Sequence, residues 1–416
     1  MENKKTKNKR ANAPDRKFMK SIFRPDAFII TTNIFLFVWL LTMIPLNLGF
    51  LDPISKALTD FDIYDIYFSK LRVEPEADTS IVIVNIGNLS RDGIARQINN
   101  LNKFNPKIIG LDALFEVRRD PQADSMLAAA FAETKNMVLV SRLDNYNETR
   151  NSYDSLKTPV DLFNRYAMNG YANLPDDATG SFRTIRNFIP FSNYTGGKVA
   201  SFVMKIFEQT DKNAFQKFME RGKEFEMINY RGNYDKFYFI DVADCLDENA
   251  DLSVVRNKIV LMGYLGTDIN TKTLEDVFFT PMNEKYAGRT FPDMYGVVIH
   301  ANILSMMLHG NFINRLPLAF GIMFAFFVGY INALLLLYSK KMIPDWFGGI
   351  TKLVLFLQAL ANLIVVVLIF DRYNYRITLT LAIAVVFLVP TSIDIYSNYL
   401  EKLYRVITLK YRKGKQ

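Results

Sequence analysis

Cysteine and histidine are scarce in this sequence. Its 416 residues include one cysteine, Cys245, and two histidines, His300 and His309. A lone cysteine cannot form an internal disulfide, so a hydrophobic core must hold the folded part together. The two histidines are nine positions apart on one predicted helix, about half a turn out of phase, and no Cys–His spacing typical of a zinc site occurs. We therefore expect no disulfide, no metal and no other cofactor.

The signatures of common catalytic sites are missing as well. The sequence contains no G-x-S-x-G, H-E-x-x-H or P-loop pattern. No dinucleotide-binding G-x-G-x-x-G follows the first predicted strand, where Asn85-Ile86-Gly87-Asn88-Leu89 stands, and Gly263-x-x-Gly266 is only half of such a motif. We expect the protein not to be an enzyme and not to bind nucleotides.

Charge is nearly absent from four apolar stretches. These are residues 27–50, 316–338, 353–370 and 377–396, in which the one charged residue is Asp394. Each is long enough for a bilayer core of ~30 Å at about 1.5 Å per helical residue. The first stretch lacks the small-residue cleavage pattern of a signal peptide, so we expect it to be retained. The sequence therefore predicts four transmembrane helices.

Basic residues flank these stretches on one side. They lie in residues 1–26, at Lys340 and Lys341, and in the short basic tail 397–416. The positive-inside rule then places both termini in the cytoplasm and residues 51–315 outside it. This layout is typical of a multi-pass protein of the bacterial inner (cytoplasmic) membrane whose main domain is periplasmic. The net charge of +8 comes largely from these flanks, so we expect contact with membrane lipids and no nucleic acid.

The external segment reads as an α/β domain. Residues 81–86, 108–111 and 137–140 are short buried strands, separated by predicted helices at 90–102 and after Asp124, which we expect to cap its helix. This βαβαβ start predicts a mostly parallel sheet with helices on its faces. Further strands are predicted at 225–230, 237–240 and 258–263, a helical connector at 51–80, and long surface loops at 143–193.

Five segments resemble the CHASE-two family, the type-two cyclase- and histidine-kinase-associated sensory extracellular domains. In chain order they are Pro106-Lys107-Ile108-Ile109-Gly110-Leu111-Asp112, Gly170…Asn173…Asp177…Gly180…Arg183…Arg186, Ile228-Asn229-Tyr230-Arg231-Gly232, Lys258-Ile259-Val260-Leu261-Met262-Gly263…Asp276…Thr280-Pro281, and Tyr295-Gly296-Val297-Val298-Ile299-His300-Ala301-Asn302-Ile303-Leu304. In the last segment, tyrosine and valine stand where the family usually has proline and glutamate. The family's layout, with one span before the domain and three after it, is similar to the one predicted here.

The resemblance implies a sensory domain that normally controls a cytoplasmic kinase or nucleotide cyclase. Only about twenty residues follow the last predicted span, so we expect no effector within this chain. The first hypothesis is a sensor that relays to a separate membrane or cytoplasmic protein, or acts as an oligomer. The alternative is a structural or scaffolding subunit of a cell-envelope complex such as secretion or motility machinery.

Four residues are candidates for ligand binding. Asp112 follows a buried strand and Asp276 follows the strand at 258–263 after a loop, so the two could hold a cation or a polar ligand at one sheet edge. The alternative is that each caps a helix or orders a loop. Arg183 and Arg186 either clamp an anionic ligand or make structural hydrogen bonds.

Within the apolar stretches, three amide side chains are candidates for contacts between helices. Asn332 lies in the second stretch, and Gln358 and Asn362 lie four residues apart on one face of the third. We expect them to bond to other helices of this chain or of a partner.

Overall fold

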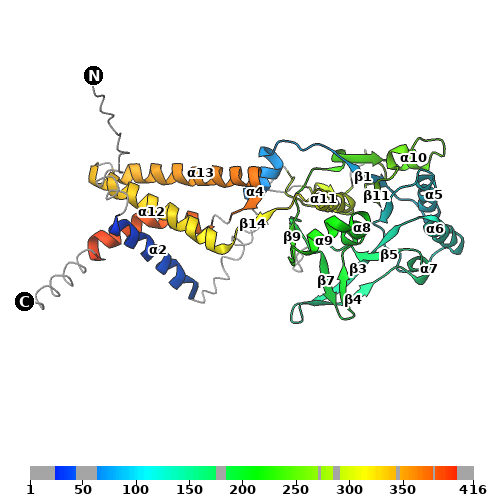
Figure 1. Ribbon diagram of the computed structural model, residues 1–416, viewed down its shortest axis with the longest axis horizontal. Coiled ribbons are helices and arrows are strands. Elements are labelled where there is room, and N and C mark those ends of the chain that lie inside the picture. The colour runs from blue at the N-terminus through cyan, green and yellow to red at the C-terminus, as the bar shows by residue number, and fades with distance from the viewer. Residues whose placement is uncertain are drawn as a thin grey trace, which may run out of the picture. The chain divides into compact units, whose positions relative to one another are not determined.

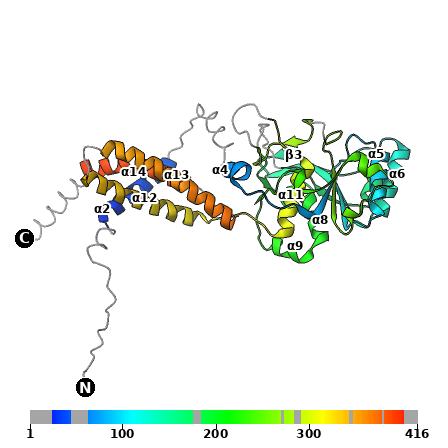
Figure 2. The ribbon, with the colours of Figure 1, turned by 90° about the horizontal axis from the view of Figure 1, so that it is seen from above.

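The structure, a computed structural model, describes residues 24–43, 63–174, 184–269, 273–283, 291–342, 347–377 and 380–400. The chain divides into two units, one formed by Phe50–Ile313 and the other by Met1–Gly49 together with Asn314–Gln416. Figures 1 and 2 show the ribbon from two directions. Each unit is described by itself below.

The unit Phe50–Ile313 contains, in its described residues, a nine-stranded sheet. The strand order is β10-β1-β11-β2-β3-β4-β7-β8, and β5 pairs with β3 beside this path. Strands β10, β1, β11, β2, β3 and β5 run parallel, whereas β4 and β8 are antiparallel to the strands before them in the chain. The bounds are β1 Asp78–Asn85, β2 Ile108–Leu111, β3 Met137–Asn147, β4 Ser152–Lys157, β5 Met168–Tyr171, β7 Phe191–Tyr194, β8 Gly197–Ala200, β10 Phe237–Ile240 and β11 Ile259–Gly263.

Helices cover both faces of this sheet (Figure 1). One face carries α5 (Arg91–Asn102), α6 (Pro121–Glu133), α7 (Asp161–Asn164) and α10 (Val242–Leu246), and the other carries α8 (Phe202–Thr210), α9 (Lys212–Met219) and α11 (Gly296–His309). Alternate residues of β1 point to opposite faces, so Val82 and Val84 join the core beneath α5 and α6. The predicted βαβαβ start and mostly parallel sheet are confirmed.

Short elements complete this unit. They are α4 (Ile63–Ile66), the π-helical turn η2 (Tyr67–Leu71), β6 (Asn187–Phe188), β9 (Glu226–Met227), the 3₁₀ turns η3 (Tyr234–Lys236) and η4 (Ser253–Val255), β12 (Val277–Phe278) and β13 (Met294–Tyr295). Of the predicted helical connector, residues 51–62 lie outside the described residues. Residues 63–71 form α4 and η2, where Tyr64, Tyr67 and Phe68 are buried. The prediction is wrong for residues 72–80, because residues 72–77 are not helical and β1 begins at Asp78.

Asp124 does not cap its helix as predicted. The cap of α6 is Asp120, whose carboxylate accepts a hydrogen bond from Ala123 N at 2.8 Å, and Pro121 occupies the first helical position, where no backbone donor is needed. Asp124 lies one turn further on and forms a buried ion pair with Arg91 of α5 at 2.5 Å. The ion pair joins α5 to α6, an arrangement that the spacing within α6 alone does not indicate.

Two further predictions need correction. The segment 143–193 is not a set of long surface loops, because β3 continues to Asn147 and turns back as β4, with Tyr146 and Tyr153 in edge-to-face contact at 5.1 Å. Its polar residues resemble a loop because both faces of this hairpin are largely exposed. The predicted strand 225–230 is reduced to Glu226–Met227, because the backbone N–H of Asn229 donates to Met306 Sδ at 3.3 Å and not to a neighbouring strand.

The second unit contains four long helices in its described residues. They are α2 (Pro25–Met43), α12 (Leu318–Met342), α13 (Phe347–Tyr373) and α14 (Thr380–Ile395), the last continued by the π-helical turn η6 (Tyr396–Leu400). A short parallel pair, β14 (Asn314–Arg315) and β15 (Tyr375–Arg376), lies just before α12 and just after α13 in the chain. Helix α2 packs against α12 and α14 at Gly329, where a Cβ would lie 2.5 Å from Val385 Cγ1.

Three helices among the described residues are long and apolar enough to cross a membrane. They are Leu318–Met342, Thr351–Tyr373 and Leu381–Tyr399, which correspond to the second, third and fourth predicted spans. The first predicted span, 27–50, is described only to residue 43, and its apolar helix Pro25–Leu41 is shorter than a span. Three spanning helices are therefore supported, and a fourth is not confirmed.

Candidate ligand-binding site

A pocket of about 580 Å³ lies where the parallel strands of the sheet end. Its wall includes Gly87 after β1, Asp112 after β2, Ser141 at the end of the parallel part of β3, and Tyr264 after β11. Open parallel sheets place ligands at this edge, where loops from several strands converge. The volume is within the range of small-molecule sites.

Asp112 lies at the base of this pocket. Its backbone N–H donates to Met262 O at 2.7 Å, which continues the β2–β11 pairing by one residue and fixes the position of the side chain. The carboxylate is only 15% exposed, and His300 Nε2 is 3.8 Å from Asp112 Oδ2, beyond hydrogen-bond distance. Burial raises the pKa of Asp112 to about 7.

Asp276 is held opposite the first turn of α11. Its backbone has a left-handed conformation (φ 54°), and its carbonyl accepts from Gly296 N at 3.1 Å. A Cβ on Gly296 would lie 3.1 and 3.2 Å from the two Asp276 carboxylate oxygens, so glycine allows this close approach. Burial, and then the negative charges of Asp112 and Glu275, raise the pKa of Asp276 to about 7. Because each acid resists ionisation beside the other, the pair holds a proton near neutral pH.

Two further polar side chains of the wall are buried and have an atom without a partner. His300, one turn after Gly296 on α11, is 4% exposed, and burial lowers its pKa to about 4, so its ring is neutral. Its ring lies edge-to-face against Phe202 at 5.4 Å. Among the described residues, His300 Nδ1 and Ser141 Oγ have no hydrogen-bond partner. Buried polar atoms rarely lack a hydrogen-bond partner, so we expect a ligand or water to bond to these two atoms.

Helix α11 is fixed to the loop 229–232 by Asn302. The Asn302 Oδ1 atom accepts from Arg231 N at 2.6 Å and from Gly232 N at 3.2 Å, and its Nδ2 donates to Gly232 O at 2.9 Å. These bonds satisfy the N–H groups of Arg231 and Gly232 and the carbonyl of Gly232, three backbone groups that lie outside the β-strands. Two of the quoted segments, the one at 228–232 and the one at 295–304, therefore meet in space.

The C-terminal end of α11 is tied to the start of β1. Ser305 Oγ donates to Asp78 Oδ2 at 2.6 Å, and His309 Nε2 lies 3.1 Å from the same oxygen. Burial alone would raise the pKa of Asp78, but hydrogen bonds from Ser305 and Ser80 outweigh it and lower the pKa. Helix α11 thus carries pocket residues in its first two turns, and at its other end it contacts the ionised Asp78 carboxylate of β1.

The model of the CHASE2 domain family matches residues 34–336, about three quarters of the chain. The chain belongs to this family. CHASE2 domains are extracellular sensory domains, which agrees with the resemblance seen in the sequence. No curated protein and no solved structure matches the chain.

Within this CHASE2 domain the four predicted site residues do not form a single site. Asp112 and Asp276 share the pocket, as their places after neighbouring parallel strands led us to expect. Arg183 lies outside the described residues. Arg186 does not line the pocket, and its guanidinium forms a bidentate ion pair with buried Asp65 of α4, with N–O distances of 2.9 and 2.5 Å. Its geometry matches the structural alternative.

The sequence alone did not single out Ser141 or the neutral His300 as pocket residues. The spacing of Gly296 and His300, four residues apart on a predicted helix, is the signal that could have placed His300 beside the helix start. Nothing in the sequence links Ser141 to them, because the link is the parallel pairing of β3 with β2.

The three predicted amides of the apolar stretches are described in the second unit. Both side-chain amide atoms of Asn332 on α12, Gln358 Oε1 on α13 and Asn362 Nδ2 on α13 are buried without a hydrogen-bond partner among the described residues. An unpaired polar group in hydrocarbon is costly, so each needs a further donor, acceptor or water.

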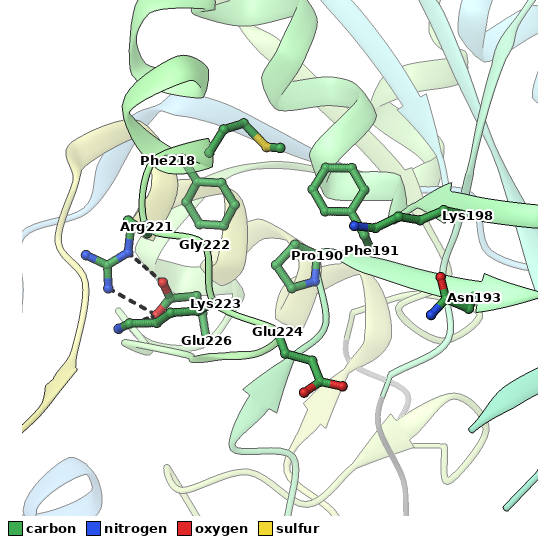
Figure 3. A pocket seen from close by; sticks show the side chains of 11 residues that line it. Pro190, Phe191, Asn193, Lys198, Phe218, Arg221, Gly222, Lys223, Glu224 and Glu226 are labelled. Carbon is green, nitrogen blue, oxygen red and sulfur yellow. Dashed lines mark hydrogen bonds and ion pairs between the residues drawn. The ribbon is translucent and has the colours of Figure 1, made fainter. Parts of the chain in front are cut away.

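A second pocket of the CHASE2 domain, of about 310 Å³, is lined by several basic side chains (Figure 3). These cations already have partners. Arg221 Nε and Lys223 Nζ bond to buried Glu226 at 2.5 and 3.2 Å, and the Lys198 ammonium lies over the Phe191 ring at 5.0 Å. The pocket at the carboxyl edge of the sheet, with its unpaired buried atoms, is therefore the better candidate site.

Proposed function

We propose that this chain is a membrane-anchored sensor that binds a small polar ligand in the pocket at the carboxyl edge of the CHASE2 sheet. The observation that carries the proposal is the double role of α11, which supplies Gly296 and His300 to the pocket and ends at His309. The chain then passes through residues 310–317 into α12, a helix long enough to span a membrane. A ligand that shifts α11 therefore acts on the segment that enters the membrane.

We further propose four membrane crossings, with both termini cytoplasmic and the CHASE2 domain in the periplasm of a bacterial inner membrane. Basic residues before the first apolar stretch, at Lys340 and Lys341, and after the last stretch support this orientation. Fusing reporters that are active only in the cytoplasm or only outside it to residues 310 and 342 tests it. The proposal requires the outside reporter to be active at residue 310 and the cytoplasmic reporter to be active at residue 342, and the reverse pair of signals would contradict it.

The relay is proposed to end on a separate cytoplasmic or membrane protein, or on a second copy of this chain. The unsatisfied amides of Asn332, Gln358 and Asn362 support a further helix or rearrangement within the membrane. Purification of the protein from native membranes in mild detergent tests this proposal. Co-purification of a regulatory protein would support the relay. Stoichiometric recovery of secretion or motility components would instead favour a scaffolding role.

We propose no catalytic role for the pocket. Ser141 Oγ and His300 Nδ1 each lack a hydrogen-bond partner in the described part of the chain, so they do not form the bonded nucleophile–base pair that acyl transfer needs. Cys245, the one free thiol, is buried, and burial raises its pKa to about 12, which leaves it protonated.

The ligand-binding proposal is tested on the full chain in lipid nanodiscs. A library of small polar metabolites is screened for compounds that raise the Tm, and hits are repeated with Ala113→Phe, which adds a bulky ring at the pocket wall, and with Ala113→Ser as the matched control. We expect hits that stabilise wild type and Ala113→Ser but not Ala113→Phe. Hits unaffected by Ala113→Phe would place the binding elsewhere, and a library without hits would contradict the proposal.

A further inference from the structure

We infer that the ligand of this pocket is a small organic cation, a compound that carries a primary ammonium or guanidinium group. This inference rests on the proposed function and names the ligand class for the same site. It follows from the charge of the wall, the position of its aromatic rings, and its unpaired acceptors.

The wall of the pocket is acidic. Asp112, Glu275 and Asp276 contribute carboxyl groups, whereas among the described residues Arg142 is the one basic lining residue besides the neutral His300. Arg142 is 48% exposed and lies 3.3 Å from Glu116 and 3.4 Å from Asp144, so its charge is already balanced. These carboxyl groups would repel an anionic ligand and attract a cationic one.

An aromatic ring lies beside the acidic pair. A Cβ built on Gly296 would lie 3.3 Å from Phe278 Cε2 and 3.1 Å from Asp276 Oδ2. The Phe278 ring and the Asp276 carboxylate therefore both approach Gly296. Tyr264 lines the same pocket and is held edge-to-face by Tyr295 at 6.2 Å. An aromatic ring beside a carboxylate favours an alkylammonium or guanidinium group over a neutral or anionic one when the cation meets the face of the ring.

The unpaired buried atoms provide a third, independent observation. The hydroxyl oxygen of Ser141 is an acceptor, and so is Nδ1 of the neutral His300 ring in the tautomer that carries its proton on Nε2. An ammonium group offers three N–H donors and a guanidinium five, which matches two carboxylates and these acceptors. A bare metal ion fits less well, because no group of three or more metal-ligating side chains with suitable geometry occurs in the described part of the chain.

Binding of a cation is coupled to proton release. Asp112 and Asp276 both have pKa values raised to about 7 in the empty pocket, and a cation between them lowers these values. Below about pH 7 the ligand must displace a proton, whereas above it the acids are already ionised. Affinity therefore rises with pH up to about 7 and then levels off.

The test uses four probes that share a four-carbon chain, on the full protein in nanodiscs at pH 8. They are the cations 1,4-diaminobutane and agmatine, the neutral 1,4-butanediol and the anion succinate, with binding measured by calorimetry. We expect the cations to bind and the other two not to. Asp112→Asn and Asp276→Asn should weaken cation binding roughly tenfold to a hundredfold, whereas Asp154→Asn, at an exposed carboxylate paired with Arg150, should not.

The outcomes separate the ligand class from the proposed function. If cationic hits from the library or the probe set are lost in Asp112→Asn, the inference holds. If the compounds blocked by Ala113→Phe are neutral or anionic and bind Asp112→Asn as well as wild type, the cation inference is overturned while the sensor proposal stands. If no compound binds in a way that Ala113→Phe blocks, both fail.

Discussion

The side chain of Asn302 and the backbone of Gly232 form a closed pair of hydrogen bonds. Gly232 N donates to Asn302 Oδ1 at 3.2 Å, and Asn302 Nδ2 donates to Gly232 O at 2.9 Å. Asn302 lies on the helix that carries the pocket residues Gly296 and His300, and Gly232 belongs to the 229–232 loop. These two bonds hold α11 in place whether or not a ligand is bound. A substitution of Asn302 can therefore test whether ligand binding and the relay to α12 are separable.

We expect Asn302→Ala to destabilise the domain by about 2–4 kcal/mol, because it leaves the Arg231 and Gly232 backbone groups buried without partners. Thermal unfolding of the full chain measures the change. Asn249→Ala, at an exposed side chain, is the matched control and should change stability little. A Tm of Asn302→Ala equal to that of the control would show that other contacts hold α11 in place.

Stability should fall as the pH rises through the range set by Asp112 and Asp276. In an unfolded chain aspartate titrates near ~3.9, whereas burial raises both pKa values to about 7 in the fold. The folded state therefore holds extra protons at these two acids between about pH 4 and 7, which lowers the free energy of unfolding over this window. His300, whose pKa burial lowers to about 4, opposes this with a single proton, so the two acids outweigh it and the net free energy of unfolding still decreases.

Asp112→Asn removes one of the two repelling charges. Without ligand, we expect the variant to be more stable than wild type by about 1–3 kcal/mol at pH 8, with the difference shrinking toward pH 4. Unfolding measured across this pH range checks the trend. A loss of stability of the same size at every pH would mean that Asp112 acts through its hydrogen-bonding geometry and not through its charge.

The comparison of sequence and structure shows what local pattern can reveal. Strands β1 and β2 were predictable because each contains a short, continuously buried apolar run, and helix α5 because its apolar residues recur at helical spacing. Asp112 and Asp276 could be placed near one sheet edge because each follows a strand. The insertion of β11 between β1 and β2 was not predictable, because it depends on a crossover spanning most of the domain. The polar hairpin β3–β4 resembled a loop because neither of its faces is well buried.

Long-range ion pairs show the same limit. The pattern around Arg186 cannot show that its partner is Asp65, because the two are 121 residues apart. A polar arginine in such a segment is equally compatible with ligand binding, and only the fold decides between the two. The buried ion pair between Arg91 and Asp124, which are 33 residues apart in the sequence, is a second case.

We expect Arg186→Gln to lower stability by about 3–5 kcal/mol, because it leaves the Asp65 carboxylate buried without its bidentate partner. The double variant Asp65→Asn/Arg186→Gln should be clearly more stable than the sum of the two single changes predicts, since no buried charge remains. Chemical unfolding of the four proteins in the cycle measures this coupling. Ligand affinity should stay unchanged in every variant that folds, and a selective loss of binding in Arg186→Gln would restore the anion-clamp hypothesis.

The relay through α11 predicts a ligand-dependent change at the far end of α12. Met342 ends this helix and is 60% exposed, so Met342→Cys provides a reporter thiol. Native Cys245 is fully buried, and burial raises its pKa to about 12, so it should react slowly and add little background. We expect saturating ligand to change the rate at which a maleimide labels Met342→Cys in nanodiscs.

Asn302→Ala should weaken this change while the pocket still binds, because the variant frees α11 from the 229–232 loop without altering Asp112, Asp276 or His300. Binding is measured on the same sample by calorimetry, so a loss of relay can be told apart from a loss of ligand. An identical labelling change with and without Asn302 would mean that the signal reaches α12 by another route. A labelling rate that ignores saturating ligand in the otherwise native chain would instead make the domain a binding module with no relay through α12.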